Sequence, residues 1–348
     1  MSLSTKRLAP PAPQFIFVDV NRRCNLHCLH CMYWKGKPDN PSTHISIKHR
    51  GEIIREFAAM NENGAVIICG GESMLDLDRF FAVTSTCAES GLRCFSVING
   101  TRVTTTEMAD RMIEEGPTEI TVSLNSHRKD IHDETRGVEG SFDKAVGALR
   151  LFLASRNRKG HGPRIFVMAL ICERNYRELD QFYDFVLNDI GADKLKLNFL
   201  QPTFGPPTLW YQDRFFDKNV IRDEEELART ISVCDEKYGL RINPLWLEQV
   251  KMYHRSIRKN GWRRLGWRRG KGTEVHICNS YERNIMVDLW GRARLCFYPG
   301  FPAFQLLQPG DLRRFWESCD RLRQRMSHCN RYCAISHSVR KESATLKD

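Results

Sequence analysis

The chain has 348 residues, of which 41% are hydrophobic and 27% charged, so it is neither collagen-like nor disordered and has room for one large domain or two medium ones. Its 53 basic and 42 acidic residues give a net charge of +11, a surplus typical of proteins with an anionic partner. Nine of the basic residues and no acidic residue lie between positions 251 and 271, so the rest of the chain is nearly neutral. This localisation argues against a nucleic-acid-binding face spread over the whole fold.

The chain contains thirteen cysteines. Its first residues lack the apolar stretch of a signal peptide, and no window approaches about 18 consecutive apolar residues, so we expect a cytoplasmic protein without a transmembrane segment. An odd number of cysteines in such a chain favours reduced thiols and metal or cluster ligation over a disulfide framework.

Strands and helices alternate along the first part of the chain. Strands are predicted at 15–20, 65–69, 93–98, 119–124, 164–172 and 194–200, and helices at 47–60, 75–89, 105–115, 142–154 and 176–188. Six such alternations in about 190 residues are too few for an eight-stranded barrel and predict an α/β fold, a partial (β/α)6 TIM-type barrel. The chemistry of such folds lies at the carboxyl ends of the strands. Residues 202–210 break the rhythm, and a helix at 224–238 follows.

The sharpest motif follows the first strand, where Cys24, Cys28 and Cys31 have the spacing C-x3-C-x2-C. Three thiolates on a short loop can hold three irons of a 4Fe–4S cluster and leave the fourth open to another ligand. Zinc is the alternative, since His27 or His30 could complete a four-ligand site.

A second set of cysteines lies near the C-terminus and comprises Cys278, Cys296, Cys329 and Cys333. The residues between the first two predict a β-hairpin that turns between Asp288 and Gly291. A helix is predicted from Gly310 to about residue 326. A hairpin and a returning helix can bring four thiolates together for a second cluster. Scattered free thiols and a zinc site are the alternatives.

The cysteine loop resembles that of the radical S-adenosylmethionine (SAM) superfamily, over roughly residues 14–202. Further matches follow in order on the predicted strands. The second strand ends in Gly70-Gly71-Glu72, the third in Asn99-Gly100, and the fourth leads through Ser123 and Asn125 to Arg136-Gly137. By this resemblance, the SAM-binding residues are His30, Gly70, Gly71, Glu72, Asn99, Ser123, Asn125 and Arg136. His30 departs from the family pattern, which usually has a large aromatic residue there.

The resemblance implies an oxidoreductase that cleaves SAM reductively to methionine and a 5′-deoxyadenosyl radical, which then takes a hydrogen atom from the substrate. The C-terminal cysteines resemble the "twitch" half of the SPASM extension, which carries one auxiliary cluster. The expected cofactors are therefore two 4Fe–4S clusters and SAM, with an external flavodoxin- or ferredoxin-type electron donor. The Cys329–Cys333 spacing differs from the usual C-x2-C, which leaves Cys319 as a substitute ligand.

The basic segment contains a repeat, Gly-Trp-Arg-Arg-Leu then Gly-Trp-Arg-Arg-Gly, and its glycines disfavour a helix. A solvated loop is one interpretation; a surface for an acidic partner protein or an anionic membrane is another. A third has arginine forks that bind phosphate or carboxylate beside a stacking tryptophan. Candidate substrate contacts are Cys172, Lys196, Asn198, Trp262, Arg263, Trp267 and Tyr298. Cys172 could donate a hydrogen atom to a substrate radical, although core packing is the simpler interpretation.

The resulting hypothesis is a radical SAM enzyme of specialised biosynthesis that acts on a small anionic metabolite, such as a nucleotide, nucleoside or sugar derivative. A peptide-modifying maturase is the first alternative, and a zinc-stabilised nucleic-acid-binding module is the second. The expected organisation is a tail (1–13), the barrel (14–205), a linker or insert with the basic segment (206–273), a small twitch domain of β-hairpin plus helix (274–340) and a second tail (341–348).

Overall fold

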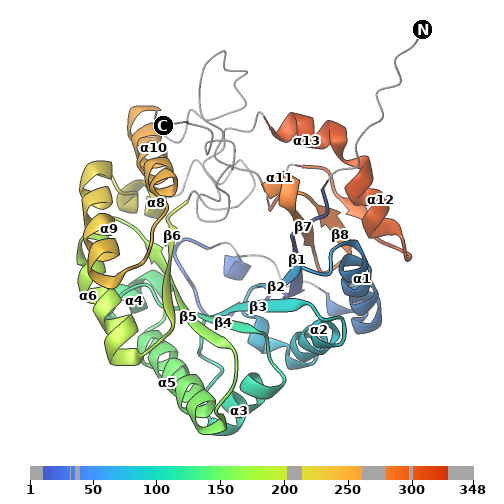
Figure 1. The fold of residues 1–348 in the computed structure, drawn as a ribbon, viewed down its shortest axis with the longest axis horizontal. Coiled ribbons are helices and arrows are strands. Elements are labelled where there is room, and N and C mark those ends of the chain that lie inside the picture. The colour runs from blue at the N-terminus through green and yellow to red at the C-terminus, as the bar shows by residue number, and fades with distance from the viewer. Residues whose placement is uncertain are drawn as a thin grey trace.

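The computed structural model describes residues 11–31, 33–35, 40–201, 214–260, 280–297 and 301–327, which share one nine-stranded sheet of order β6-β5-β4-β3-β2-β1-β7-β8-β9. The first six strands are β1 (Phe15–Asn21), β2 (Ala65–Gly70), β3 (Arg93–Ile98), β4 (Glu119–Ser123), β5 (Arg164–Ile171) and β6 (Lys194–Phe199). Each is parallel to the next, and together they follow an open arc (Figure 1). The predicted partial barrel is confirmed.

Six helices connect these strands and lie on the outer side of the arc (Figure 1). They are α1 (Ile47–Met60), α2 (Leu77–Glu89), α3 (Thr106–Glu114), α4 (Lys129–Arg136), α5 (Ser141–Lys159) and α6 (Leu179–Asp184). The starts of α1, α2 and α3 are set by Ser46, Asp76 and Thr105, whose side chains each accept the backbone N–H three residues on.

Two helical regions differ from the sequence prediction. The segment predicted as one helix at 176–188 is a 3-10 turn (Tyr176–Glu178), then α6, then a π-helical turn (Phe185–Ile190). The helix α4 has no counterpart in the prediction. It is short and mostly polar, and it buries His132, Thr135 and Arg136 beside a single apolar residue, Ile131, so no hydrophobic stripe marks it.

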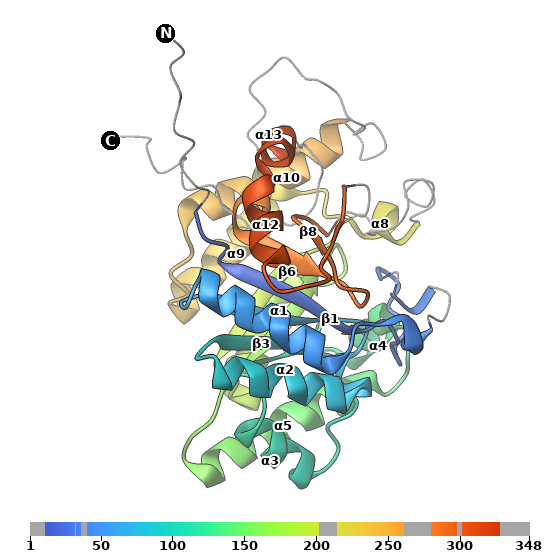
Figure 2. The ribbon, with the colours of Figure 1, turned by 90° about the vertical axis from the view of Figure 1, so that its right-hand side faces the viewer.

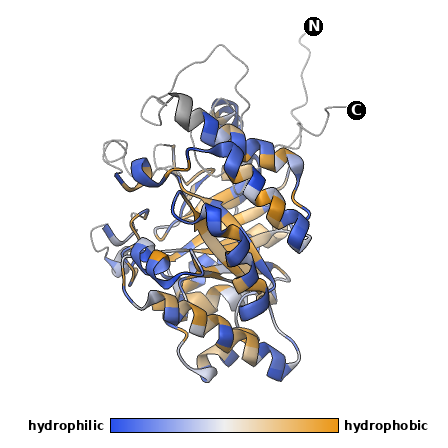
Figure 3. Ribbon diagram, turned by 90° about the vertical axis from the view of Figure 1, so that its left-hand side faces the viewer, coloured by the Kyte–Doolittle hydropathy of each residue, from blue (hydrophilic) through white to orange (hydrophobic). Residues whose placement is uncertain are grey.

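The core lies between the sheet and its outer helices. Ile16, Val18 and Val20 of β1 face this layer and are buried. Figure 3 shows strands that are mostly hydrophobic, with much of the hydrophilic colour on the helices that cross in front of them. Since all six strands are parallel, the loops that follow them meet at one edge of the sheet. No helix in the described ranges has the length and apolar character that a membrane span requires.

The C-terminal segment extends the same sheet beyond β1. It contains α11 (Ser280–Arg283), β7 (Asn284–Val287), β8 (Arg292–Arg294), β9 (Phe304–Gln305), α12 (Asp311–Ser318) and α13 (Asp320–Met326). The strand β7 runs parallel to β1, pairing Phe15 with Asn284, and then turns back into β8. The N–H of Gly291 donates to the carbonyl of Asp288 at 3.0 Å, which confirms the predicted hairpin. Figure 2 shows α12 and α13 beyond β1, on the side away from β3.

The helices α8 (Arg214–Asn219), α9 (Glu224–Tyr238) and α10 (Pro244–Asn260) follow the barrel strands. The expectation of a helix-poor basic segment is wrong for its first half, because α10 continues to residue 260. The physical reason is that the three glycines of the segment all come later, at 261, 266 and 270. The Tyr253 hydroxyl on α10 donates to the carbonyl of Leu200 at 2.9 Å, which fixes α10 to the end of β6.

Candidate functional site

The cysteine loop begins directly after β1, at the carboxyl edge of the sheet. Cys28 is buried, whereas Cys24 and Cys31 are half-buried. Burial, together with the negative charges of Cys28, Glu72 and Cys31, raises the pKa of Cys24 to about 11, so the three thiols lie within electrostatic range of one another. In the described part of the chain no three His, Cys, Asp or Glu side chains converge on a single-ion site. The fit to an iron–sulfur cluster therefore rests on the shared loop and this mutual interaction of its thiols.

Backbone hydrogen bonds fix this loop to the end of α4. The N–H groups of His27 and Leu29 donate to the carbonyls of Arg136 and Thr135 at 3.1 and 3.2 Å. On the other side of the loop, Trp34 Nε1 donates to the Cys28 carbonyl at 2.9 Å. The cysteines are therefore presented by a loop that is tethered on both sides.

The Gly70-Gly71-Glu72 motif ends β2 and packs against the start of the cysteine loop. The N–H groups of Gly71 and Glu72 donate to the carbonyls of Asn21 and Arg23 at 2.9 and 2.8 Å, which continues the β1–β2 pairing into the loop. A Cβ on Gly70 would lie 2.1 Å from the Asn21 oxygen, and one on Gly71 would lie 2.1 Å from the Arg23 oxygen. Gly70 is thus required by the backbone at the end of β1, and Gly71 by the backbone of the loop that follows it.

Gly71→Ala should lower the free energy of unfolding by about 3 kcal/mol and reduce iron loading, because the new methyl group meets backbone atoms that cannot rotate away. Chemical denaturation and iron analysis would measure both effects. Gly147→Ala on α5 is the control, since a Cβ there meets nothing within 4 Å. It should raise the free energy of unfolding by about 0.5–1 kcal/mol. Equal stability of the two variants would contradict this reading of the motif.

Glu72 is buried, with 2% of its surface exposed, and both carboxylate oxygens accept backbone N–H groups. Oε1 accepts from Met74 at 3.0 Å and Oε2 from Asn99 at 2.7 Å. Burial nevertheless raises its pKa to about 7, although these two hydrogen bonds and the charges of Arg136 and Arg102 oppose the shift. A carboxyl group of this kind is poised to ionise when a cation reaches it.

A side-chain network that the sequence analysis missed joins Asn99 to the cysteine loop. Asn99 Nδ2 donates to Asn25 Oδ1 at 2.9 Å, and Asn25 Nδ2 donates to Thr101 Oγ1 at 2.7 Å. Asn99 Oδ1 in turn accepts from the Thr101 hydroxyl at 2.7 Å. Asn25 lies inside the cysteine motif, and Thr101 directly follows Asn99-Gly100. In the sequence, only these positions in or next to the motifs could have indicated that the two residues belong to the site.

Asn125, predicted to contact SAM, is fully buried and connects the elements around α4. Its Nδ2 donates to Thr135 Oγ1 at 2.8 Å, and its Oδ1 accepts from the Leu170 N–H at 3.1 Å and from Arg136 at 3.3 Å. Its carbonyl accepts from Asn175, a residue the sequence analysis did not single out, at 2.6 Å. Asn125 therefore positions Arg136. Ser123 is half-buried at the end of β4.

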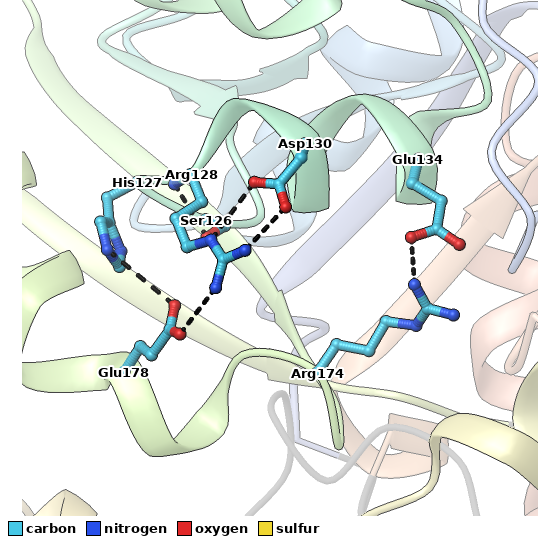
Figure 4. A network of polar contacts seen from close by, with 7 residues as sticks. All are labelled: Ser126, His127, Arg128, Asp130, Glu134, Arg174 and Glu178. Carbon is cyan, nitrogen blue, oxygen red and sulfur yellow. Dashed lines mark hydrogen bonds and ion pairs between the residues drawn. The ribbon is translucent and has the colours of Figure 1, made fainter.

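Ion pairs on the outer side of α4 join both its ends to the loop after β5 (Figure 4). At the start of the helix, Arg128 binds Asp130 at 2.7 Å and Glu178 at 3.1 Å. Near its end, Glu134 pairs with Arg174. These pairs are exposed and each contributes little, so the buried contacts of Asn125 hold α4 more strongly.

His30 lies near α8, with its ring centroid 6.3 Å from that of Phe215. Burial, and then the charges of Arg136 and Lys35, lower the pKa of His30 to about 3, which keeps the ring neutral. Phe215 was not predicted from sequence. It places an aromatic ring close to the position where the family usually carries one.

The predicted substrate residues of the barrel differ in their surroundings. Cys172 is fully buried in the core, and burial raises its pKa to about 11. Lys196 pairs with Glu119, the first residue of β4, so its amino group is directed away from the carboxyl edge. Asn198 is half-buried on β6.

Most of the predicted auxiliary-cluster and basic-repeat residues lie outside the described residues. These are Cys278, Cys329, Cys333, Trp262, Arg263, Trp267 and Tyr298. Cys296 is half-buried just after β8. Cys319 is 6% exposed between α12 and α13, and burial raises its pKa to about 11.

Residues 18–186 match the model of the Radical SAM superfamily. This part of the chain belongs to that superfamily of enzymes. The radical SAM chain is 25% identical over 194 residues to the AdoMet-dependent heme synthase of Methanosarcina barkeri, covering 55% of this chain and 52% of the relative. It is 31% identical over 200 residues to the mycofactocin maturase MftC of Mycobacterium tuberculosis, covering 57% of this chain and 48% of the relative. The chain thus spans about half the length of these curated relatives.

A likeness of fold to a solved structure extends beyond the residues that the superfamily model matches. The solved structure of native anSMEcpe with bound AdoMet superposes with a TM-score of 0.61 and covers 96% of this chain and 86% of that chain. The sequence identity of the two is 14%, so the likeness concerns the fold alone.

Proposed function

We propose that this chain cleaves SAM reductively and uses the resulting 5′-deoxyadenosyl radical to take a hydrogen atom from its substrate. The observation that carries the proposal is the loop of Cys24, Cys28 and Cys31, which is fixed between α4 and the Gly70-Gly71-Glu72 motif at the carboxyl edge of a partial barrel. When bound there, a 4Fe–4S cluster would supply the electron for the cleavage.

The surrounding residues would bind and orient SAM. The buried carboxylate of Glu72 is suited to its ammonium group, while Ser123 and Arg136 lie on the side proposed for its carboxylate. Gly70, Gly71 and Asn99 shape the backbone around these groups, with Asn125 holding Arg136 in place. His30, with Phe215 nearby, would border the adenine.

A small anionic metabolite, such as a nucleotide, nucleoside or sugar derivative, remains the proposed substrate. Support comes from the basic segment between residues 251 and 271, whose first cations have acidic partners. Lys251 and Arg255 on α10 are paired with Glu225 of α9 at 3.0 and 2.8 Å, so their charges are already balanced. Recognition of an anion would therefore fall to the later residues, with Trp262, Arg263 and Trp267 the candidates.

Peptide modification is the second candidate function, and the likeness to the maturase MftC favours it. The two candidates differ in substrate size. Dialysable and non-dialysable fractions of a host extract can be supplied separately while 5′-deoxyadenosine is measured. Stimulation by the dialysable fraction alone supports a metabolite, and stimulation by the other fraction alone supports a peptide or protein.

We also propose one auxiliary 4Fe–4S cluster bound by Cys278, Cys296, Cys329 and Cys333. Cys319, which lies between α12 and α13, is the substitute ligand. The cluster would accept an electron in a net oxidation or stabilise the local structure. A flavodoxin- or ferredoxin-type donor and a cytoplasmic location complete the proposal.

Anaerobic reconstitution tests the function directly. The wild-type protein should bind about eight irons per chain and release 5′-deoxyadenosine when SAM and dithionite are added. The triple variant Cys24→Ala, Cys28→Ala, Cys31→Ala should bind about four irons per chain and release no 5′-deoxyadenosine. Cys296→Ala should also bind about four irons fewer than the wild type, but it should still cleave SAM. Cys234→Ala, in a buried thiol of α9, is the control and should match the wild type. Four irons and no SAM cleavage by the wild-type protein would overturn the proposal.

A further inference from the structure

The end of α4 forms a platform beneath the second cysteine of the loop. Gly137, which follows the helix, has a φ of +67°, and a Cβ there would lie 2.4 Å from the His27 oxygen. This close approach, together with the hydrogen bonds from His27 and Leu29, sets the loop against the helix end. The last side chain of α4, that of Arg136, is thereby brought beneath Cys28.

Arg136 is a buried cation, with 9% of its surface exposed. One terminal nitrogen lies 3.7 Å from Cys28 Sγ, within hydrogen-bonding distance for sulfur, and the other donates to Asn125 Oδ1 at 3.3 Å. The Nε of Arg136 has no hydrogen-bond partner among the described residues. Within the same residues, the guanidinium group forms no ion pair with a carboxylate. A buried guanidinium without a paired anion is costly, so the arrangement favours negative charge at Cys28.

We propose that Arg136 donates a hydrogen bond to the Cys28 thiolate and thereby raises the reduction potential of the cluster at the cysteine loop. The inference rests on the proposed function, because it requires a cluster on this loop. Reduction adds negative charge to a cluster and its thiolates, and a fixed positive donor stabilises that state more than the oxidised one. Asn125 orients the guanidinium toward the sulfur, and burial limits screening by salt.

This role is separable from contact with the SAM carboxylate, because it operates before SAM binds. The measurement is therefore a redox titration of the reconstituted, SAM-free protein, followed by electron paramagnetic resonance. The triple cysteine variant, titrated in parallel, shows which signals belong to the cysteine loop. Three substitutions separate charge from hydrogen bonding: Arg136→Lys keeps the charge, Arg136→Gln keeps a neutral donor, and Arg136→Met removes both.

The potential should fall in the order wild type, Arg136→Lys, Arg136→Gln, Arg136→Met. At a fixed applied potential, Arg136→Met should reduce the ratio of reduced to oxidised cluster about tenfold, which for one electron is a shift of about 59 mV. If that variant fails to assemble its cluster, Arg136→Lys and Arg136→Gln still test the order. Arg128→Met is the matched control: it removes an arginine at the other end of the same helix, whose charge is paired at the surface (Figure 4), and should leave the potential unchanged.

Unchanged potentials in assembled Arg136→Lys and Arg136→Gln variants would overturn the inference while leaving the proposed function intact. An equal shift in Arg128→Met would also overturn it, since the effect would then be one of overall charge. Failure of the wild-type protein to bind a cluster through Cys24, Cys28 and Cys31 would instead refute the proposed function.

Discussion

Asn125→Ala should lower the free energy of unfolding by about 3–4 kcal/mol, a large effect for a residue outside the hydrophobic core. The substitution removes the acceptor of the buried Leu170 N–H and of Arg136, and it also removes the donor to Thr135. Each buried polar group left without a partner costs about 1–3 kcal/mol. Denaturant unfolding followed by circular dichroism would measure the loss.

The same variant should also bind less iron, because α4 carries the carbonyls to which the cysteine loop is tethered. Asn188→Ala is the matched control. Asn188 is exposed, and its side chain donates to Asp184 Oδ1 within the same helical segment at 2.7 Å. It should change the free energy of unfolding by less than about 0.5 kcal/mol. If the two variants were equally stable, the hydrogen bonds of Asn125 would not hold α4 in place.

SAM affinity should rise about fivefold between pH 6 and pH 7 through the ionisation of Glu72. Its pKa is raised to about 7 by burial, so at pH 6 most molecules must lose this proton before the carboxylate can pair with the SAM ammonium group. An α-ammonium group titrates near pH 8 and stays mostly charged over this interval. Equilibrium binding of SAM to the reconstituted protein at several pH values measures the dependence.

Glu72→Gln should bind SAM more weakly at pH 7 and show no rise over this interval. The pH dependence of the free energy of unfolding provides a second test of the raised pKa of Glu72. Because the pKa is higher in the folded protein than in the unfolded chain, ligand-free wild type should lose stability as the pH rises from about 4.5 to 7, and the glutamine variant should lose less. An unchanged pH dependence of SAM binding in Glu72→Gln would show that another group is responsible.

The strands could be predicted from the sequence because parallel strands covered on both faces form continuous apolar runs. The limits of β3 agree with the prediction, and those of the other strands differ by one residue or so. The cysteine loop was equally visible, since chemistry and spacing coincide in one short motif. Both signals are local in the sequence.

The remaining parts of the site depend on contacts between distant residues. The helix α4 buries polar side chains that are stabilised by Asn125 and by the cysteine loop, so periodicity cannot reveal it. The two glycines of the Gly70-Gly71-Glu72 motif were predicted only as SAM-binding residues, and the structure adds the backbone of Asn21 and Arg23 as their neighbours. In the basic segment, nearby glycines obscured a helix whose cations pair with α9.

The pairing of β7 with β1 has a consequence for how the chain acquires its structure. β1 precedes the other described strands in the chain, yet one of its two edges is completed only by a strand about 270 residues later. Until that segment leaves the ribosome, the strand that carries the cysteine loop exposes a row of unpaired backbone groups open to association with other chains. The loop would thus be presented on an unfinished sheet through most of synthesis. Cluster insertion and protection of this edge are therefore expected to fall late, after the hairpin of β7 and β8 has formed.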